Sequence, residues 1–246
     1  MTTRFICGIS LLAAVILTPV PAGAQDAVAP PASRSLVETF KQDLKSVVSK
    51  ENASVLSAAT AFALFAQPFD TTLTYSASCS TFLKTTFDPW ARVSGQEWVL
   101  AGGAAATYVY GRVSGNSQLA AVGGDLIEAE LIAGAGTHVL KYATQRPRPD
   151  GEEFSFPSGH AAGTFAMATV LQRHYGLKAA VPAYTFAVLI SGARLQANSH
   201  YPTDIIAGAA LGILSGRAAT FELGSRRLQM SPSAIPGGFA VTGSIQ

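Results

Sequence analysis

The stretch from Lys141 to Asp204 contains, in this order, the motifs Lys141-x6-Arg148-Pro149, Pro157-Ser158-Gly159-His160 and Arg194-x5-His200-x3-Asp204. Together they supply three cations, two histidines and one carboxylate, with a glycine-bearing turn between them. Each motif is common by itself. The ordered set provides the groups needed to hold a tetrahedral oxyanion and to attack its central atom.

The first motif places two cations close together. Lys141 lies at the end of the helix expected over residues 118–142, so its ammonium group projects beyond the last turn. Arg148 follows in Arg146-Pro147-Arg148-Pro149, where each residue before a proline is driven into an extended conformation. Arginine grips phosphate oxygens in a bidentate fork, and lysine supplies a compact point charge. Arg146 has no place in the motif, and we interpret it as a surface or flanking residue.

The second motif predicts the start of a helix that faces an anion. Ser158 is a favourable N-cap, and Gly159 lets the backbone approach a bound anion closely. The amide groups at a helix start carry partial positive charge, which favours phosphate. His160, in the first turn, is expected to face the same space.

The third motif predicts a histidine oriented by a carboxylate. Pro202 is tolerated in a first helical turn, so Asp204 should lie one turn beyond His200 and accept the hydrogen on its Nδ1. This contact would leave Nε2 of the ring free to attack. Arg194 ends the preceding helix and can reach over the connecting loop. Taken alone, His200 and Asp204 could equally form a purely structural pair.

The combined set resembles the motifs of the type 2 phosphatidic acid phosphatase (PAP2) superfamily. This superfamily also contains bacterial class A acid phosphatases and vanadium haloperoxidases. The motif resemblance covers the chain from Lys141 to Asp204 and departs from the family pattern at one position. The third motif usually opens with Ser-Arg, but Ala193 precedes Arg194 here, so hydroxyl support for this arginine is missing.

The resemblance implies a phosphatase that hydrolyses phosphomonoesters or lipid phosphates without a metal or another cofactor. His200 would attack phosphorus to form a phosphohistidine and Asp204 would hold it in position, while His160 would protonate the departing alcohol. The phosphoryl oxygens would be bound by Lys141, Arg148, Ser158, Gly159 and Arg194. Two alternatives remain open, a haloperoxidase that holds vanadate in the same pocket and a catalytically silent membrane scaffold.

Apolar periodicity predicts an all-α fold, a compact bundle of about six core helices. These helices are expected at residues 53–66, 97–110, 118–142, 158–175, 179–196 and 203–221, and an amphipathic helix at residues 35–50 precedes them. Asp88-Pro89-Trp90 is interpreted as part of a polar connection. Residues 34–225 would form the PAP2-like domain. Residues 226–246 would form a C-terminal extension, in which the segment around Pro236-Gly237-Gly238 predicts a small hairpin or an ordered extension.

The composition restricts the classes of partner. The chain is 48% hydrophobic and only 13% charged, about half the usual charged fraction. Helices are therefore either buried very completely or in contact with a membrane. The charge-free stretches at 98–111, 179–193 and 205–216 are too short for a hydrocarbon core about 30 Å thick, which favours a buried bundle. A net charge of +2 without a basic stripe argues against nucleic acid, and no spacing typical of metal ligands is present.

The N-terminus predicts export. Residues 1–24 combine Arg4, a short apolar run and the cleavage site Ala22-Gly23-Ala24, which is typical of a signal peptide. Residues 25–33 would form a flexible leader, and an uncleaved membrane anchor is the alternative. A periplasmic location is consistent with a mature chain whose single cysteine is Cys79, which we expect to be a buried apolar group.

Three further titratable residues receive no catalytic role. His138 and His174 are expected to be structural or exposed. Glu130 shares a helix face with Lys141 but lies about 16 Å from it along the axis, so it could line an inner channel without touching the phosphate.

Overall fold

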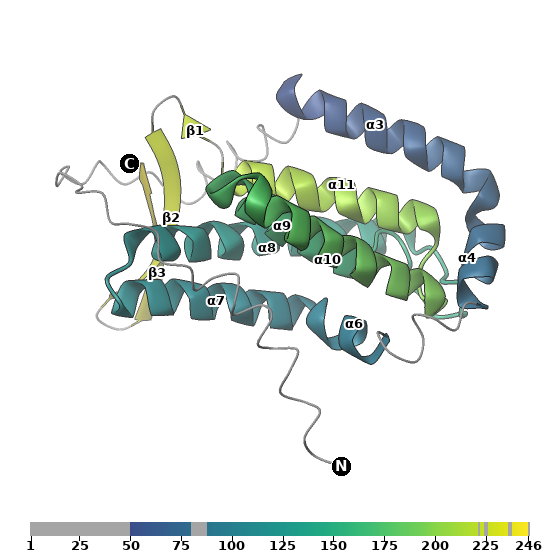
Figure 1. Ribbon diagram of the computed structural model, residues 1–246, viewed down its shortest axis with the longest axis horizontal. Coiled ribbons are helices and arrows are strands. Elements are labelled where there is room, and N and C mark those ends of the chain that lie inside the picture. The colour runs from purple at the N-terminus through teal and green to yellow at the C-terminus, as the bar shows by residue number, and fades with distance from the viewer. Residues whose placement is uncertain (1–49, 80–87, 221, 224–225, 236–237, 246) are drawn as a thin grey trace, which may run out of the picture. The chain divides into compact units, whose positions relative to one another are not determined.

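The computed structural model describes residues 50–79, 88–220, 222–223, 226–235 and 238–245, and the structural statements below concern these residues. The expected signal peptide, the leader and residues 35–49 of the expected amphipathic helix lie outside them. Figure 1 shows a bundle of long helices followed by a small antiparallel sheet. The prediction of an all-α core is therefore confirmed.

The elements follow one another without crossover in the sheet. The helices are α3 (Lys50–Ala66), the 3-10 turn η1 (Gln67–Phe69), α4 (Asp70–Ser78), α6 (Asp88–Ser94), α7 (Glu97–Val113), α8 (Ser117–Thr144), α9 (Gly159–Tyr175), α10 (Leu177–Gln196) and α11 (Pro202–Ala219). The strands are β1 (Glu222–Leu223), β2 (Arg226–Ile235) and β3 (Gly238–Ile245). Strands β2 and β3 pair in antiparallel register from Leu228 with Ile245 to Ile235 with Gly238, which is the predicted hairpin.

Two short helices, α4 and α6, contradict the interpretation of their segment as a polar connection. Helix α4 is rich in threonine and serine, whose low helix propensity hides it in the sequence. Tertiary contacts support it instead, because the Asp70 carboxylate accepts hydrogen bonds from the amide and the hydroxyl of Thr203, at 3.1 and 2.6 Å. Helix α6 begins with Asp88-Pro89, where proline suits a first turn.

Helix α9 lies at the centre of the core and packs against α8, α10 and α11. The core between these helices is built mostly from small side chains, since Ala129, Ala162 and Ala166 are fully or almost fully buried. Small side chains let helix axes approach closely, so the ends of the helices are held in a narrow range of positions.

Glycines on one face of α11 set its distance from α9. A Cβ on Gly208 would overlap the carbonyl oxygen of Ser158, and one on Gly212 would overlap the carbonyl oxygen of Ala162. Only glycine permits this approach. Because Ser158 directly precedes α9 and Gly208 lies one turn after Asp204, the close packing brings the second and third motifs side by side.

The substitution Gly212→Ala is expected to destabilise the bundle by about 3 kcal/mol, because it forces apart backbone atoms that cannot rotate away. Urea denaturation measures this free energy of unfolding. The matched control is Gly102→Ala on α7, where an added Cβ meets nothing within 4 Å. Alanine should stabilise that exposed helical position by about 0.5–1 kcal/mol. Equal effects at the two positions would contradict the packing argument.

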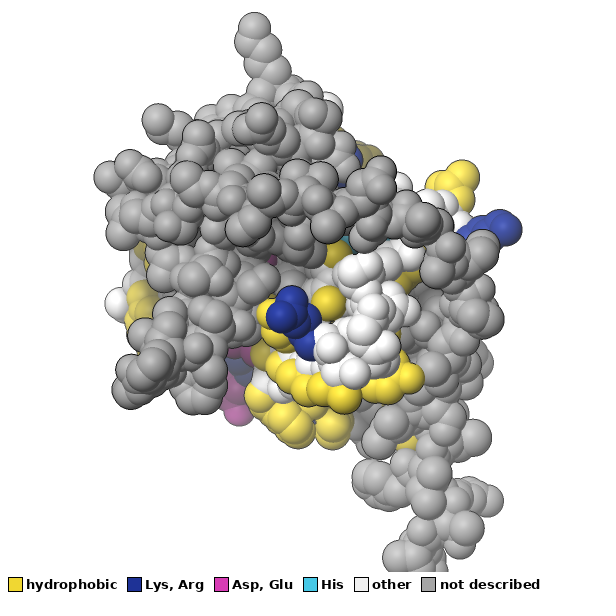
Figure 2. All heavy atoms as spheres, turned by 90° about the vertical axis from the view of Figure 1, so that its left-hand side faces the viewer, with side chains coloured by type: hydrophobic (Ala, Val, Ile, Leu, Met, Phe, Trp, Pro, Cys, Tyr) yellow, Lys and Arg dark blue, Asp and Glu magenta, His cyan; other side chains and the backbone are white. Residues whose placement is uncertain are grey.

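Large apolar side chains are exposed on several helices. Phe65, Trp98 and Val113 are 73%, 69% and 83% exposed, and Figure 2 shows apolar side chains at the surface of the face that it displays. Within the described part of the chain, no helix has both the length and the hydropathy required to cross a membrane. Cys79 is also exposed, so the expectation that it is buried is wrong.

Candidate active site

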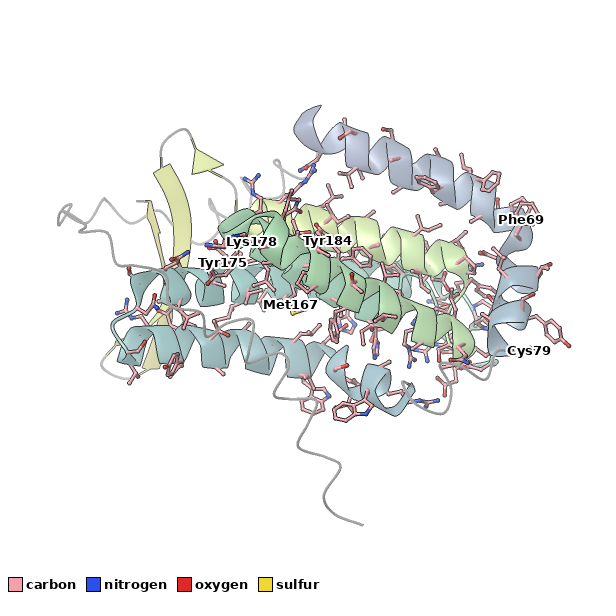
Figure 3. All side chains as sticks on the ribbon, viewed as in Figure 1. Phe69, Cys79, Met167, Tyr175, Lys178 and Tyr184 are labelled. Carbon is pink, nitrogen blue, oxygen red and sulfur yellow. The ribbon has the colours of Figure 1, made fainter. Side chains whose placement is uncertain are left out.

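The three motifs come together at one end of the bundle. Figure 1 shows the C-terminal ends of α8 and α10 and the N-terminal ends of α9 and α11 at this end, together with α4 and α6. In Figure 3, many side chains lie at this end beside α4, and the label of Cys79 marks the residue that follows α4. The structure thus brings together segments that are distant in the sequence.

The first motif supplies two cations with different surroundings. Lys141, in the last turn of α8, donates from Nζ to the carbonyl oxygen of Phe154 at 2.5 Å. Phe154 has a φ of 62°, a left-handed conformation that is uncommon for a bulky residue. Arg148 pairs with the exposed carboxylate of Glu152 at 2.7 Å. Its Nε is buried without a hydrogen-bond partner among the described residues, so this arginine retains donor capacity for an anion.

The second motif begins α9 as predicted. The buried Ser158 is its N-cap and accepts a hydrogen bond from the amide of Ala161 at 3.5 Å. The amide of Ser158 donates to the carbonyl oxygen of Asp204 at 3.0 Å, which joins the second motif directly to the third. Gly159 is the first residue of α9, and a Cβ there would lie 2.9 Å from Oε1 of Glu97. His160 follows in the first turn.

The third motif differs from expectation in one contact. His200 is only 2% exposed and precedes α11, and its Nδ1 lies 3.7 Å from Oδ2 of Asp204. This distance is too long for a hydrogen bond, so the predicted Nδ1–H contact is absent. The Asp204 carboxylate instead accepts hydrogen bonds from the Ser155 hydroxyl at 2.5 Å and the Tyr201 amide at 2.8 Å.

Arg146 is an essential part of this arrangement, which sequence reasoning missed. Its guanidinium donates to Asp204 and Thr203, each at 2.7 Å, and to Asp70 at 2.8 Å. The guanidinium also lies 4.2 Å above the centre of the Tyr201 ring. The interpretation as a surface residue is therefore wrong. The available signal was the repeated Arg-Pro pair, since Arg146 lies within the first motif, two residues before Arg148.

Burial among apolar side chains accounts for alanine at position 193, where the usual third motif has serine. Ala193 is fully buried and belongs to an apolar cluster with Ala91 of α6 and Ile190 of α10. A methyl group here packs against its apolar neighbours, whereas a hydroxyl would need a hydrogen-bond partner. The adjacent Arg194 is itself 8% exposed.

The pKa shifts show that the motif side chains act on one another. Burial, followed by the positive charge of Arg194, lowers the pKa of His160 to about 4. Burial also lowers the pKa of His200, with Lys141 and Arg194 acting in the same direction and Asp204 opposing them. Both rings are therefore neutral near pH 7. An anion bound among these cations would raise both pKa values, so the electrostatics favour an anionic ligand.

The pKa of Asp204 is lowered despite burial, which acts in the opposite direction. Its interactions with His200, Ser155 and the Tyr201 amide stabilise the carboxylate, and Arg146 adds to this effect. Asp204 therefore remains negatively charged at neutral pH.

Lys141 predicts a pH-dependent affinity for anions. Burial, followed by repulsion from Arg148, lowers the pKa of Lys141 to about 8. The ammonium group is charged below this pH and neutral above it, so sulfate should bind about tenfold more weakly at pH 9.5 than at pH 7. Isothermal titration calorimetry measures the change with an anion whose own charge stays constant. Lys141→Arg keeps its charge and should show a flatter dependence. Identical pH profiles would contradict the assignment.

Two carboxylates continue from the site along α9. Burial, followed by repulsion from Glu97, raises the pKa of Glu130 to about 8. A Cβ on Gly163, one turn after Gly159, would lie 2.9 Å from Oε2 of Glu130. Glu130 thus lies one turn beyond the second motif, so it approaches the site without joining it.

The other two histidines form pairs outside the motifs. His138 pairs with Glu97 at 3.2 Å, and the buried His174 pairs with Asp125 at 2.7 Å. In the described ranges, no three side chains of the histidine, cysteine, aspartate or glutamate type converge as metal ligands would.

Comparison with known proteins agrees with this arrangement. Residues 123–223 match the family model of the PAP2 superfamily, and this segment contains all three motifs. The matched segment is less than half of the chain. The crystal structure of LpxE from Aquifex aeolicus has a TM-score of 0.53 at 24% identity, and the match covers 61% of this chain and 94% of LpxE. A likeness of this degree shows that the two proteins share a fold.

Two curated relatives are phosphatases. Lipid A 1-phosphatase of Porphyromonas gingivalis is 39% identical over 89 residues, which are 35% of this chain and 20% of that protein. Decaprenylphosphoryl-5-phosphoribose phosphatase of Mycobacterium tuberculosis is 32% identical over 114 residues, which are 39% of this chain and 63% of that protein. The chain therefore matches less than two thirds of the length of either relative.

Proposed function

We propose that this PAP2 protein is a phosphatase that hydrolyses phosphate monoesters through a phosphohistidine, without a metal ion. The observation that carries the proposal is the direct junction of the second and third motifs, the Ser158 amide on the Asp204 carbonyl. This contact keeps the glycine turn beside His200 while the cations act on both histidines.

In the proposed binding step, charge and directed donors replace a metal ion. The phosphoryl oxygens are bound by Lys141, Arg148, Arg194, the Ser158 hydroxyl and the Gly159 amide. Ser158 accepts a hydrogen bond from the Ala161 amide and still carries a hydroxyl hydrogen that it can donate. Positive charge that is fixed in a partly dry site stabilises the phosphoryl transition state more strongly than it would in water.

In the proposed chemical steps, His200 is the nucleophile, and His160 is first the general acid and then the general base. Nε2 of His200 attacks phosphorus, and the P–O bond to the alcohol breaks as His160 gives it a proton. The neutral His160 then removes a proton from water, the water oxygen attacks phosphorus, and the P–N bond breaks. Asp204 stabilises the positive charge on His200 electrostatically across 3.7 Å.

We propose lipid phosphates as the substrate class. Both curated relatives are named for phosphatases of lipid-linked compounds, and large exposed apolar side chains such as Phe65 and Trp98 suit contact with lipid. Export by the N-terminal segment would place the domain outside the cytoplasm. Cell fractionation, followed by extraction with and without detergent, tests both points. Release of the protein without detergent would count against lipid substrates.

The test of the reaction uses the purified protein with p-nitrophenyl phosphate and with phosphatidate in mixed micelles, each in the presence of EDTA. We expect both substrates to be hydrolysed and EDTA to have no effect. Orthovanadate should inhibit competitively. Absence of hydrolysis, or its loss in EDTA, would overturn the proposal, and bromide oxidation by peroxide in the presence of vanadate would establish the haloperoxidase alternative.

A further inference from the structure

A corner of the chain outside all three motifs encloses the ring of His160. It lies where α6 ends and α7 begins, and it includes Arg92 and Gly95. Nε2 of His160 lies 3.3 Å from the carbonyl oxygen of Arg92. A Cβ on Gly95 would lie 2.7 Å from Cδ2 of the same ring and 2.8 Å from Cγ2 of Ile190. The absence of a side chain at Gly95 thus makes room for the ring.

The contact with Arg92 determines which nitrogen of His160 exchanges protons. A carbonyl oxygen can only accept a hydrogen bond, so Nε2 must carry a hydrogen in both the neutral and the charged ring. Nδ1 is then the atom that gains and loses the catalytic proton. Without this acceptor the neutral ring could place its hydrogen on Nδ1, and the lone pair would then lie on Nε2.

We propose that the α6–α7 corner is a positioning element of the active site, in which the Arg92 carbonyl holds His160 as the Nε2–H tautomer and Gly95 admits its ring. The proposal rests on the proposed function. In the first step the Nδ1–H of charged His160 passes its proton to the ester oxygen as the P–O bond breaks and the bond from phosphorus to His200 forms. In the second step Nδ1 recovers a proton from the attacking water.

The substitution Gly95→Ala tests whether this corner positions His160. A positioning role predicts that the loss of activity depends on the leaving group of the substrate, whereas a general loss of packing would affect all substrates alike. The added methyl group displaces the His160 ring, so kcat/KM for glycerol phosphate, whose alkoxide needs a proton, should fall about 100-fold. This ratio reports the steps up to P–O cleavage and excludes the later attack of water, which is common to all substrates. For p-nitrophenyl phosphate, whose leaving group departs readily as an anion, kcat/KM should fall less than about threefold. Retained activity on this substrate also demonstrates that the variant folds.

A matched control and a parallel variant complete the kinetic test. Gly103→Ala places the same methyl group on an exposed face of α7, where nothing lies within 4 Å, and should change neither substrate. His160→Ala should reproduce the pattern of Gly95→Ala, with little further loss in the double variant. Equal losses on both substrates, or no loss on either, would overturn the proposal.

An observation independent of activity distinguishes failure of this proposal from failure of the phosphatase assignment. Two-bond proton–nitrogen correlation spectra of the wild-type protein report which ring nitrogen of His160 is protonated. We expect the Nε2–H tautomer near pH 7 in the wild type and a mixture of tautomers in Gly95→Ala. An Nδ1–H tautomer in the wild type would refute the positioning role even if the enzyme hydrolyses phosphoesters.

Discussion

His200→Ala is expected to lower kcat for p-nitrophenyl phosphate by about 10⁴-fold or more, because it removes the atom that attacks phosphorus. The fold should survive. Nδ1 of His200 is buried without a hydrogen bond among the described residues, so truncation removes a buried polar group together with its packing. The charges that bind phosphate remain in place, and sulfate affinity should change less than about threefold.

Rapid acid-free quenching provides a second measurement for this variant. The wild type, mixed with ³²P-labelled substrate, should retain label in alkali and lose it in acid, as a phosphoramidate bond requires, whereas His200→Ala should retain none. His138→Ala is the matched control, because this histidine is 57% exposed and pairs only with Glu97 in the contacts of the described chain. Its activity should stay within about threefold of wild type. More than about 1% activity in His200→Ala would exclude the nucleophile assignment.

The helix ends that carry the motifs could be predicted because local sequence determines them. Ser158 caps α9 and Pro202 begins α11, so the positions of His160 and His200 relative to those helix starts followed from capping and proline chemistry alone. The location of Lys141 in the last turn of α8 followed from apolar periodicity. These features need no knowledge of distant residues.

The contacts that hold Asp204 could not be predicted in the same way. Asp70 lies 76 residues before Arg146, and no local pattern connects the two. Helix α4, which supplies Asp70, has weak intrinsic propensity and depends on the contacts that it makes. The preference of Asp204 for Ser155 and Arg146 over the His200 ring also depends on tertiary geometry, since spacing alone predicts only that His200 and Asp204 share a helix face.

The role of the α6–α7 corner could not be predicted from the local sequence either. The sequence shows Gly95 between Ser94 and Gln96 in a polar stretch, which is compatible with any tight connection. Only the fold places its Cα against the His160 ring. Residues that orient a catalytic group therefore need not lie near the motif that contains it, and here they come from a segment interpreted as a simple connection.

Arg146→Met is expected to destabilise the domain by about 3 kcal/mol at pH 7, because it leaves the carboxylates of Asp70 and Asp204 buried without their cation. The Asp204 side chain is fully buried and that of Asp70 is 6% exposed, whereas Arg146 is 30% exposed. Because the cation is partly exposed, the expected loss of stability is at the lower end of the range for breaking a buried ion pair. Urea denaturation measures it. Activity should also fall about 100-fold, since Asp204 would no longer be held beside His200.

The loss of stability in Arg146→Met is expected to become smaller as the pH falls. The folded-state pKa of Asp204 lies below its unfolded value, partly because of Arg146, so its contribution to stability is present above the unfolded pKa and is lost as the pH falls through the folded pKa. In Arg146→Met the Asp204 carboxylate loses its cation and protonates more easily. The difference in stability between wild type and variant should therefore shrink as the pH falls below about 5.

Arg148→Met is the matched control, two residues further along the chain. Its guanidinium pairs with the exposed carboxylate of Glu152, so its removal should change stability by less than about 0.5 kcal/mol. Activity should nevertheless fall by about 10²–10³-fold, because a donor to the phosphoryl oxygens is lost. The two substitutions would thus have different effects, because Arg146 acts mainly on the stability of the fold and Arg148 acts mainly on catalysis. Equal destabilisation by both substitutions would contradict the role of Arg146 as the cation shared by α4 and α11.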